Sequence, residues 1–576
     1  MQFKNIVATL LVFGPSASCS KSHAVKPQIN HLLPSPPPGS GNSVVPTIIS
    51  KLPASGEASA SVYSQVTLTF SKALAPSTVI QDNFSLKIDG EQSTVTGTLT
   101  YVPESKSIRF KPDARLKSGQ SFTATLMASV KDTDGQSLAH AEVWTFSTTP
   151  EGWVWISGSD QLDVVGSFGT MGEAAAANYP GARDRANLWL DAAGNIFIAN
   201  GYAGSLAGPG DSYNDLWKWD GTNWTWTAGN IFPNQRGDFG ALNTPAASNM
   251  ISARHYAAGA SAAAKQFIYG GYVYDSAGNP GFGNDLWQWD GKSWVWLSGA
   301  TTINQASFHG LKGSADAANT PGSRGRAAAA SDKDGNLWLF GGSGCDESCV
   351  NHSMNDLWKW DGKAWVWIAG GRLGSEAGVY GLRGMPDAAN SPGARVSAQI
   401  WFDRAGKLWL FGGYGRDSQG VVGNLNDLWQ WDGSNWTWVA GSNLKNGAAS
   451  YGTKGLTAEA NTPGARSSDA QNVVVDTQGQ AYLFGGYELD AQSGQVPYND
   501  LWRWDGKNWT WVSGDDLPFK SGVYGTKGIL AASNIPGARN TGILIDAHDT
   551  IWLFGGRGKD GAGATGNLND LWRYNP

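Results

Sequence analysis

The sequence predicts an all-β protein in which a β-sandwich is followed by a six-bladed β-propeller. Between residues 46 and 150, short segments with alternating apolar residues are separated by turn signals. After Pro150, one phrase recurs six times at intervals of about 70 residues. The chain also contains 29 Trp and 76 Gly, with only 16% charged residues. Tight turns use glycine and packed sheets bury aromatic rings, so this composition favours many short strands.

The N-terminus is typical of an export signal. Lys4 supplies a positive charge, Ile6–Phe13 is a short apolar run, and "SASC" ends at Cys19. The last four residues resemble a bacterial lipobox, although leucine is usual where Ser16 stands. We expect residues 1–19 to be a signal peptide, with Cys19 lipidated after cleavage or the chain fully secreted. Residues 20–45 are rich in Pro, Ser and Gly, which predicts an extended tether.

The next segment, residues 46–150, has the alternation of a sandwich. Candidate strands are "SQVTLTFS", "FSLKI", "TGTLTY", "SIRFKP", "SFTATLMA" and "VWTFST". The phrases "VTLTFSKAL", "FKPDARLKSGQSFTATL" and "VKDTDGQSLA" running to "WTFSTTP" resemble the bacterial Ig-like domains of S-layer and surface proteins. The resemblance covers about 100 residues and implies a spacer, so we expect this domain to be a stalk.

Residues 153–576 carry the repeat. Each unit runs through "PGAR", a short strand, a "DxxGN" turn, "LWLFGG", a variable loop, "NDLWKWDG" and "WTWVAG", which predicts strands a to d of one blade. The Asp of the "ND" pair falls at Asp215, Asp285, Asp356, Asp427, Asp500 and Asp570. The double glycine and the later Trp resemble kelch repeats and the central domain of galactose oxidase, although the kelch period is usually about 50. The extra residues lie between strand d and the next strand a.

The strand count predicts how the propeller closes. The last "NDLW" strand, Asn569–Tyr574, has no "WTW" after it, whereas "WVWISG" at Trp153–Gly158 has no blade before it. We expect this N-terminal strand to complete the last blade, because pairing the two removes exposed strand edges.

The repeated side chains are expected to be structural. Trp217 and Trp219 are two residues apart, so they project from one face of their strand, where rings pack between neighbouring sheets. One Arg also recurs with each "PGAR"-type phrase. One Arg and one Asp in every blade suggest an internal ion pair, with a ring of ligand-facing arginines as the alternative.

Function is expected at the long loops. Strands alternate in direction, so the b–c and d–a connections share one face, and both are long. Candidate ligand-binding residues follow the double glycine or lie in the d–a loop: Tyr202, Tyr272, Tyr414, Tyr487, Arg557, Tyr380, Tyr451 and Tyr524. Lys312, Arg383, Lys454 and Lys527 lie near the d–a rings. Exposed aromatics beside polar groups suit sugars, whereas the alternative is that these rings hold the loops down.

One blade departs from the repeat at "GCDESCVNHS". Cys345 and Cys349 are expected to form a disulfide in an oxidising compartment, which would shape the loop. A metal site from these cysteines, His352 and His309 is the alternative, although the spacing is not a standard zinc pattern.

No enzyme site is recognisable. Galactose oxidase, the kelch-type enzyme, holds copper with two His, two Tyr and a Tyr–Cys thioether. Here the histidines of this region lie in separate blades, and no residues match that motif. We therefore expect non-catalytic binding of an extracellular carbohydrate or protein, and no cofactor. The alternatives are a polysaccharide-active oxidase, lyase or hydrolase, and a purely structural envelope protein.

Charge limits the partners. The net charge of −6 argues against nucleic acid and anionic membranes. No apolar run reaches the length of a transmembrane helix, so we expect membrane contact only through a lipid at Cys19. The sequence does not predict the oligomeric state.

Overall fold

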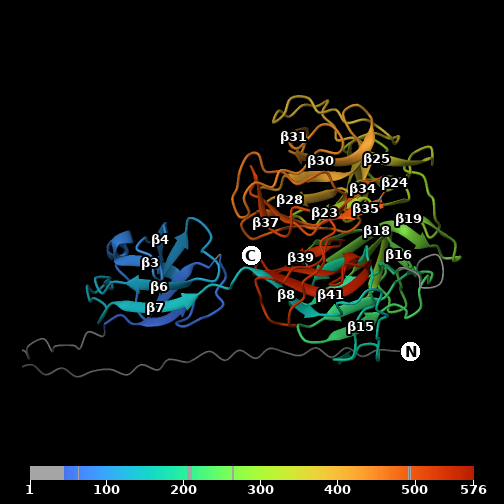
Figure 1. Cartoon of the computed structure of the whole chain (residues 1–576). Helices are drawn as coiled ribbons and strands as arrows, with labels where there is room; N and C mark the ends of the chain where they lie inside the picture. Colours follow the sequence, from blue (N-terminus) through green and yellow to red (C-terminus); the bar gives the residue numbers. More distant parts are fainter. Residues whose placement is uncertain are drawn as a thin grey trace, which may run out of the picture.

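The computed structural model describes residues 45–62, 64–203, 211–262, 265–490, 492 and 494–575. The predicted signal peptide, Cys19 and the tether up to residue 44 lie outside the described residues. The rest is all-β, with 2% helix and 45% strand, and Figure 1 shows a small N-terminal domain beside a larger body. Within the described residues, no helix is long and apolar enough to cross a membrane.

The N-terminal domain is a sandwich of two antiparallel sheets within the described residues, as predicted. One sheet contains β1 (Ile48–Leu52), β2 (Val66–Phe70), β5 (Ser107–Pro112) and β4 (Gly97–Val102), in that order. The other contains β3 (Phe84–Ile88), β6 (Ser121–Leu126) and β7 (Glu142–Ser147). The connections include the 3-10 helices η1 (Pro76–Thr78), η2 (Gln81–Asn83) and η3 (Pro103–Ser105). Alternate residues point inward, so that Leu68, Phe110 and Phe122 form a common core.

The larger body is built from successive antiparallel sheets, one for each sequence repeat, which we number one to six along the chain. Sheet one contains β10 (Asn187–Leu190), β11 (Ile196–Ala199), β14 (Leu216–Trp219), β15 (Trp224–Ala228) and β9 (Ala174–Ala175), with the hairpin β12 (Tyr202–Ala203) and β13 (Asp211–Ser212). Sheet two contains β16 (Arg254–His255), β17 (Ala258–Ala262), β18 (Lys265–Tyr274), β19 (Pro280–Trp289) and β20 (Trp294–Ser298). Sheet three contains β21 (Ala315–Asp316), β22 (Arg324–Gly325), β23 (Ala328–Ser331), β24 (Leu337–Cys345), β25 (Asn351–Trp360) and β26 (Trp365–Ala369).

The remaining sheets repeat this order. Sheet four contains β27 (Arg395–Val396), β28 (Gln399–Phe402), β29 (Leu408–Arg416), β30 (Val422–Trp431) and β31 (Trp436–Ala440). Sheet five contains β32 (Val473–Val475), β33 (Ala481–Phe484), β36 (Leu501–Trp504) and β37 (Trp509–Ser513), with the hairpin β34 (Tyr487–Asp490) and β35 (Gly494–Pro497). Sheet six contains β38 (Arg539–Asn540), β39 (Ile543–Ile545), β40 (Ile551–Lys559), β41 (Thr565–Asn575) and β8 (Gly152–Ser157).

The N-terminal strand β8 pairs with the C-terminal strand β41, the partner that the strand count predicts. Their antiparallel register places Trp155 opposite Trp572 and Trp153 opposite Tyr574, and the two strands lie side by side in Figure 1. Trp153 is 1% exposed and packs against Phe484 of sheet five. The outer strand of sheet six therefore comes from a segment more than 400 residues away in the chain.

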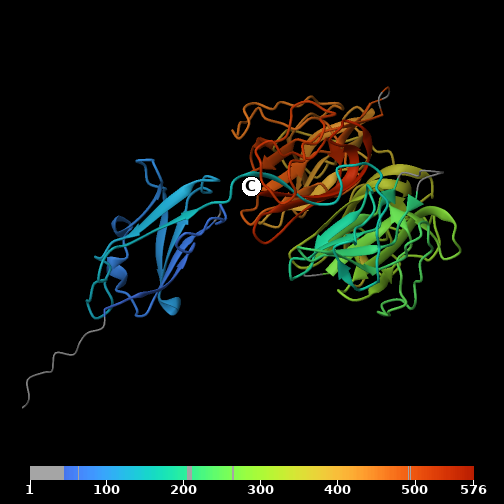
Figure 2. The ribbon, with the colours of Figure 1, turned by 60° about the horizontal axis from the view of Figure 1, so that its bottom comes forward.

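One strand of each sheet lies next to its counterpart in the following sheet. Contacts run from β10 to β17, β23, β28, β32 and β39, and β39 also contacts β10. Backbone hydrogen bonds follow the same order: Gly201 N–H donates to the Arg254 oxygen, and Gly556 N–H donates to the Arg183 oxygen. We call these six the inner strands, and Figure 2 shows the larger body from a second direction.

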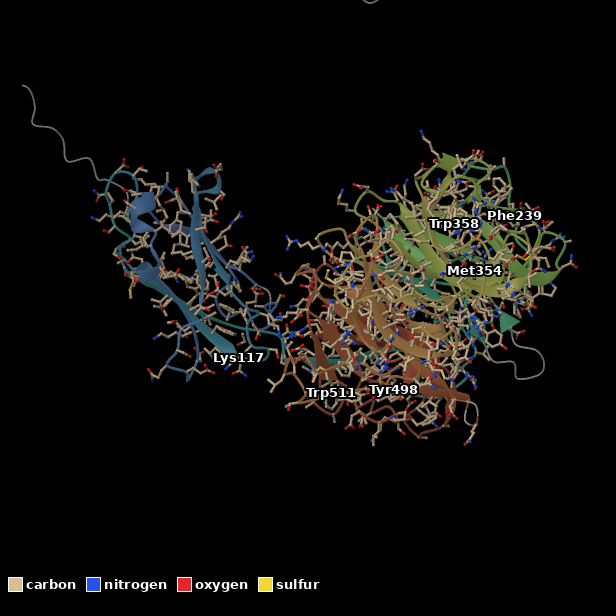
Figure 3. All side chains as sticks on the ribbon, turned by 90° about the horizontal axis from the view of Figure 1, so that it is seen from above. Lys117, Phe239, Met354, Trp358, Tyr498 and Trp511 are labelled. Atoms are coloured by element: carbon tan, nitrogen blue, oxygen red, sulfur yellow. A yellow bond between two sulfur atoms is a disulfide. The ribbon has the colours of Figure 1, made fainter. Side chains whose placement is uncertain are left out.

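The tryptophans pack between the sheets, as predicted. Those in the "NDLW" position are completely buried: Trp217, Trp287, Trp358, Trp429, Trp502 and Trp572. Trp358, labelled in Figure 3, belongs to the cluster that joins sheets two and three. Each of these rings also donates its Nε1 hydrogen to the nearby Asp carboxylate. Packing between sheets thus accounts for the strongest repeat in the sequence.

The repeated Arg and Asp form buried ion pairs, so the prediction of an internal pair is confirmed. The pairs are Arg183–Asp215, Arg254–Asp285, Arg324–Asp356, Arg395–Asp427, Arg466–Asp500 and Arg539–Asp570. In sheet four the two Arg395 nitrogens lie 2.7 and 2.8 Å from the Asp427 oxygens. These arginines point into the protein and are not available to a ligand.

The extra residues between strand d and the next strand a cover the outer edges of the sheets. β9 pairs with β15 in sheet one, and β21 pairs with β26 in sheet three. In sheet four the same part of the loop forms a single bridge between Asp387 and Trp436. Covering a free edge strand prevents its pairing with another chain, which gives these extra residues a structural role.

Candidate binding site

The long connections gather at one end of the inner strands. The residues before each inner strand and those after each double glycine pair in short bridges, such as Asp184 with Tyr202 and Val396 with Tyr414. The N-terminal domain lies near the opposite end, because Arg115 lines a hollow together with Gln478 and Gln480 of an a–b turn. The long-loop end, which we call the mouth, therefore faces away from the N-terminal domain.

At the mouth lies the second residue after each of the six repeated arginines. These residues are Arg185, Tyr256, Arg326, Ser397, Ser468 and Thr541. The first four have φ between 56° and 58°, in the left-handed region that glycine and asparagine tolerate best. Bulky side chains held in this conformation are a recognised mark of functional sites, because the fold must offset their cost of about 1–3 kcal/mol.

Arg185, Tyr256 and Arg326, which stand at this position in sheets one to three, lie across the mouth. The guanidinium carbons of Arg185 and Arg326 lie 4.4 and 4.0 Å from the centre of the Tyr256 ring, and Arg326 also donates to the Tyr256 hydroxyl. Asp469 accepts from the Ser397 hydroxyl at 2.6 Å and faces Arg185 and Arg326 at 3.4 and 3.6 Å. The Arg326 side chain remains 36% exposed, so its guanidinium can reach a ligand.

Below this cluster the inner strands enclose a narrow channel of about 40 Å³. Ala258, Ala328 and Ala398 line this channel, and Tyr256, Arg326 and Asp469 border it where it opens to the mouth. A space of this size holds only a few water molecules. Any larger ligand must therefore bind at the mouth and not within the channel.

Burial changes the ionisation of two residues at the mouth. Burial raises the pKa of the Asp184 carboxyl to about 6; the Asp469 charge adds to the shift and Arg185 opposes it. One Asp184 oxygen lies 3.2 Å from Arg185, whereas Oδ2 is buried without a hydrogen-bond partner among the described residues. Burial, together with the charges of Arg185 and Arg326, lowers the pKa of His255 to about 3. His255 is therefore neutral at physiological pH.

Replacing Asp184 with Asn should stabilise the protein at pH 7.5 by at most about 3 kcal/mol, and at pH 4.5 by only about a third of that. The folded protein binds a proton at Asp184 up to a pKa of about 6, above the ordinary value of 3.8. Between these values the folded state holds more protons than the unfolded state, so native stability falls as pH rises. Denaturant unfolding at both pH values tests this, with exposed Asp334→Asn as control. An equal effect at both pH values would contradict the raised pKa.

The candidate residues after the double glycines differ in exposure. Tyr202 and Tyr272 are half-buried and lie 4.9 and 5.3 Å from the His255 ring. Tyr414 is also half-buried, Tyr487 is only 2% exposed, and Arg557 is exposed. Four of these side chains are therefore accessible to solvent at the mouth, whereas the Tyr487 side chain is buried beside it.

The expectation that the d–a tyrosines are exposed is wrong. Tyr380 and Tyr524 are 5% and 7% exposed, and Tyr451 is half-buried. Their hydroxyls donate to Asp427, Asp570 and Asp500 at 2.6, 2.7 and 2.8 Å. Their rings pack on the buried Trp of the same sheet, so they hold the long loop down, as the alternative interpretation stated.

The cationic side chains near these tyrosines also make contacts within the protein. Lys312, Arg383, Lys454 and Lys527 lie over Trp367, Trp438, Trp511 and Trp155, with distances to the ring centres of 4.3 to 4.8 Å. These contacts lie at the outer strands of the sheets. The d–a loop therefore supplies packing and not the mouth of the site.

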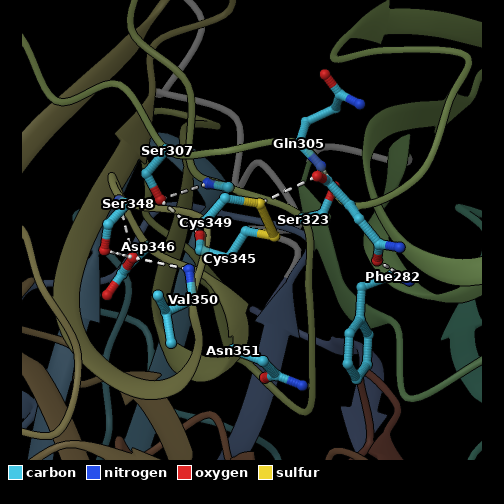
Figure 4. The surroundings of a disulfide bond; sticks show 12 residues. Phe282, Gln305, Ser307, Ser323, Cys345, Asp346, Ser348, Cys349, Val350 and Asn351 are labelled. Atoms are coloured by element: carbon cyan, nitrogen blue, oxygen red, sulfur yellow. Dashed lines mark hydrogen bonds between the residues drawn. A yellow bond between two sulfur atoms is a disulfide. The ribbon is translucent and has the colours of Figure 1, made fainter.

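The structure joins Cys345, the last residue of β24, to Cys349 in the connection to β25 by a disulfide, and Figure 4 shows its surroundings. Asp346 accepts hydrogen bonds from the backbone of Ser348 and from His352. His309 takes the place of the d–a tyrosine, with its ring 4.8 Å from that of Trp358. Among the described residues, no group of three or more His, Cys, Asp or Glu is placed to hold a metal.

Sequence reasoning missed Arg185, Tyr256, Arg326 and Asp469. A signal was present, because these positions vary between repeats directly beside the invariant Arg. The residues that recur in every repeat are packing residues, whereas these residues that differ between repeats lie at the mouth.

Comparison with known families identifies the first domain. Residues 42–148 match the family described as bacterial Ig-like domain, so the predicted Ig-like resemblance is confirmed. Such domains occur in bacterial surface proteins, which fits an extracellular or envelope location. No kelch or propeller family matches the chain, and no curated protein matches it.

Proposed function

We propose that this protein is an exported, lipid-anchored surface protein that binds an extracellular carbohydrate without catalysing a reaction. In this proposal, Cys19 carries the lipid and the Ig-like domain is the stalk. Residues 153–576 form a six-bladed kelch-type propeller whose mouth is the binding surface. The export signal, the match to bacterial Ig-like domains and the position of the mouth away from the stalk support this arrangement.

Three features support a closed propeller. One sheet is formed from each of six repeats, the inner strands contact one another in a series that returns from β39 to β10, and β8 joins β41. The hydrogen bond from Gly556 to Arg183 links the last sheet to the first in the same way that Gly201 and Arg254 link sheets one and two. Among the described residues, closure of this kind leaves the outer strand as the free edge of each sheet, and the long loops cover it.

The single observation that carries the binding function is the loss of sixfold regularity at the mouth. The ion pairs and buried tryptophans are the same in every sheet, whereas Arg185, Tyr256 and Arg326 stand where the other sheets have small hydroxyl residues. Side chains that serve packing are repeated, because every sheet needs them. Aromatic and cationic groups confined to part of the mouth suit a ligand with hydroxyl groups and an apolar face, which describes a sugar.

A glycan array with the full processed chain tests this proposal. Arg326→Ser introduces the residue type that sheet four carries at this position, so folding should be preserved while affinity falls by about tenfold or more. Arg404→Gln, an exposed arginine at an a–b turn, is the matched control and should bind normally. Binding of every glycan by Arg326→Ser as by the native chain would contradict the proposal. An array without any bound glycan would favour a protein ligand or a structural envelope role.

A further inference from the structure

A hollow of about 370 Å³ lies beside the mouth, between sheets five and six. Tyr487 and Pro497 border it on the side of sheet five, and Asn540 and Arg557 border it on the side of sheet six. Phe519, from the start of the d–a loop, completes the wall and is 41% exposed. The hollow is large enough for one sugar residue or more.

Phe519 is a departure from the repeat. The equivalent residues are Asp163, Asn234, Asn304, Ser375 and Asn446, and all six have φ between 53° and 68°. Each donates its backbone N–H to the facing strand; Phe519 donates to Pro497 and Asn234 to Ser212. Asp and Asn tolerate this left-handed conformation, whereas a bulky aromatic residue adopts it at a cost.

The facing proline explains why the usual amide is dispensable in this sheet. In sheet one the Asn234 side-chain oxygen accepts the N–H of Ser212, and Asn446 accepts that of Asn424 in the same way. Pro497 has no N–H, so an Asn at position 519 would have nothing to accept. The missing N–H of Pro497 explains why Asn is not required at position 519. It does not explain an exposed phenylalanine, because a small polar residue would adopt the left-handed conformation at a lower free-energy cost.

The polar side chains around the hollow are neutral or positively charged: they include Gln495, Thr565 and Arg557. Within the described residues, Arg557 is exposed and forms no close ion pair, and its charge acts on the buried Asp184 carboxyl. Asn540 is 1% exposed; its Oδ1 accepts from the Ser468 hydroxyl at 2.9 Å, whereas its Nδ2 is buried and unpartnered. No Asp or Glu lines the hollow among the described residues. Lys559 adds positive charge, with Nζ 5.5 Å from the centre of the Phe519 ring.

We propose that this hollow binds an anionic sugar residue of an extracellular polysaccharide. The acidic group accepts hydrogen bonds from the exposed guanidinium of Arg557, because a charged donor suits a charged acceptor. The apolar face of the sugar ring lies on Phe519. This assignment rests on the proposed carbohydrate-binding function and specifies its ligand class.

Titration calorimetry with the full processed chain tests the assignment. The probes are a galacturonate tetrasaccharide, its neutral methyl ester, a sulfated galactose tetrasaccharide and poly-glutamate. We expect the acidic sugar to bind at least tenfold more tightly than its ester, and Arg557→Gln to remove this preference. Phe519→Asn, which restores the residue type of the other sheets, should weaken both sugars about tenfold without lowering thermal stability. Arg404→Gln should leave all affinities unchanged.

The outcomes separate this assignment from the proposed function. Tighter binding of the uronate or of the sulfated sugar identifies the source of the acidic group, and both support the assignment. A neutral glycan that binds wild type and Arg557→Gln equally would overturn the acidic ligand but keep carbohydrate binding. Binding of poly-glutamate as tightly as the sugars, or of no glycan at all, would overturn both.

Discussion

Replacing Trp153–Ser157 with a flexible Gly-Ser segment of equal length is expected to lower the melting temperature of the larger body by about 10 °C or more. The change removes β8 from sheet six and leaves the edge of β41 unpaired. It also exposes the surface that Trp153 and Val154 bury, which are each 1% exposed. Burial of a Trp and a Val is worth roughly 6–9 kcal/mol before opposing terms.

Calorimetry and light scattering would measure this effect, because an unpaired edge strand also promotes aggregation. The same substitution at residues 34–38, in the Pro-rich segment, is the control and should not change the transition. If the β8 replacement melts as the native chain does, pairing with β41 does not hold the body together.

Asp427→Asn is expected to destabilise the protein by about 3–5 kcal/mol. The Asp427 carboxylate accepts two hydrogen bonds from Arg395, one from the Trp429 ring at 2.7 Å and one from the Tyr380 hydroxyl at 2.6 Å. Arg395 is 1% exposed, so the substitution leaves a buried positive charge without its partner. Denaturant unfolding at pH 7 measures the loss.

Two further variants show whether the unpaired charge is the cause. The double variant Arg395→Met, Asp427→Asn should be more stable than Asp427→Asn alone, because it removes the buried charge. Asp334→Asn breaks an exposed pair with Lys333 and should change stability by less than about 1 kcal/mol. A double variant no more stable than the single one would assign the loss to the Trp429 and Tyr380 hydrogen bonds instead.

Most of the fold could be predicted from the sequence because its signals are local. The alternation in the first domain, the spacing of the repeats and the unpaired phrase at Trp153–Gly158 each lie within a few consecutive residues. Strand direction and side-chain alternation then follow from the geometry of a β-strand. The pairing of β8 with β41 needed only a count of strands that had partners.

The candidate site was predictable only in part. The double glycines indicate the long-loop end, and Tyr202, Tyr272 and Arg557 lie there. The sequence left two interpretations open for Tyr380 and Tyr524, because a tyrosine in a long loop can point either to solvent or to a buried carboxylate. The direction of such a side chain depends on the sheet beneath the loop, which the loop sequence does not describe.

The sequence by itself determined the class of each segment, the repeat and the residues that pack every sheet, because these need only spacing and composition. Tertiary structure alone decided which unlike residues meet. Arg185 and Asp469 are 284 positions apart, yet they face each other at 3.4 Å across the mouth. The physical reason is that the inner strands of all six sheets surround one narrow channel, so side chains from sheets that are not adjacent can meet at its end.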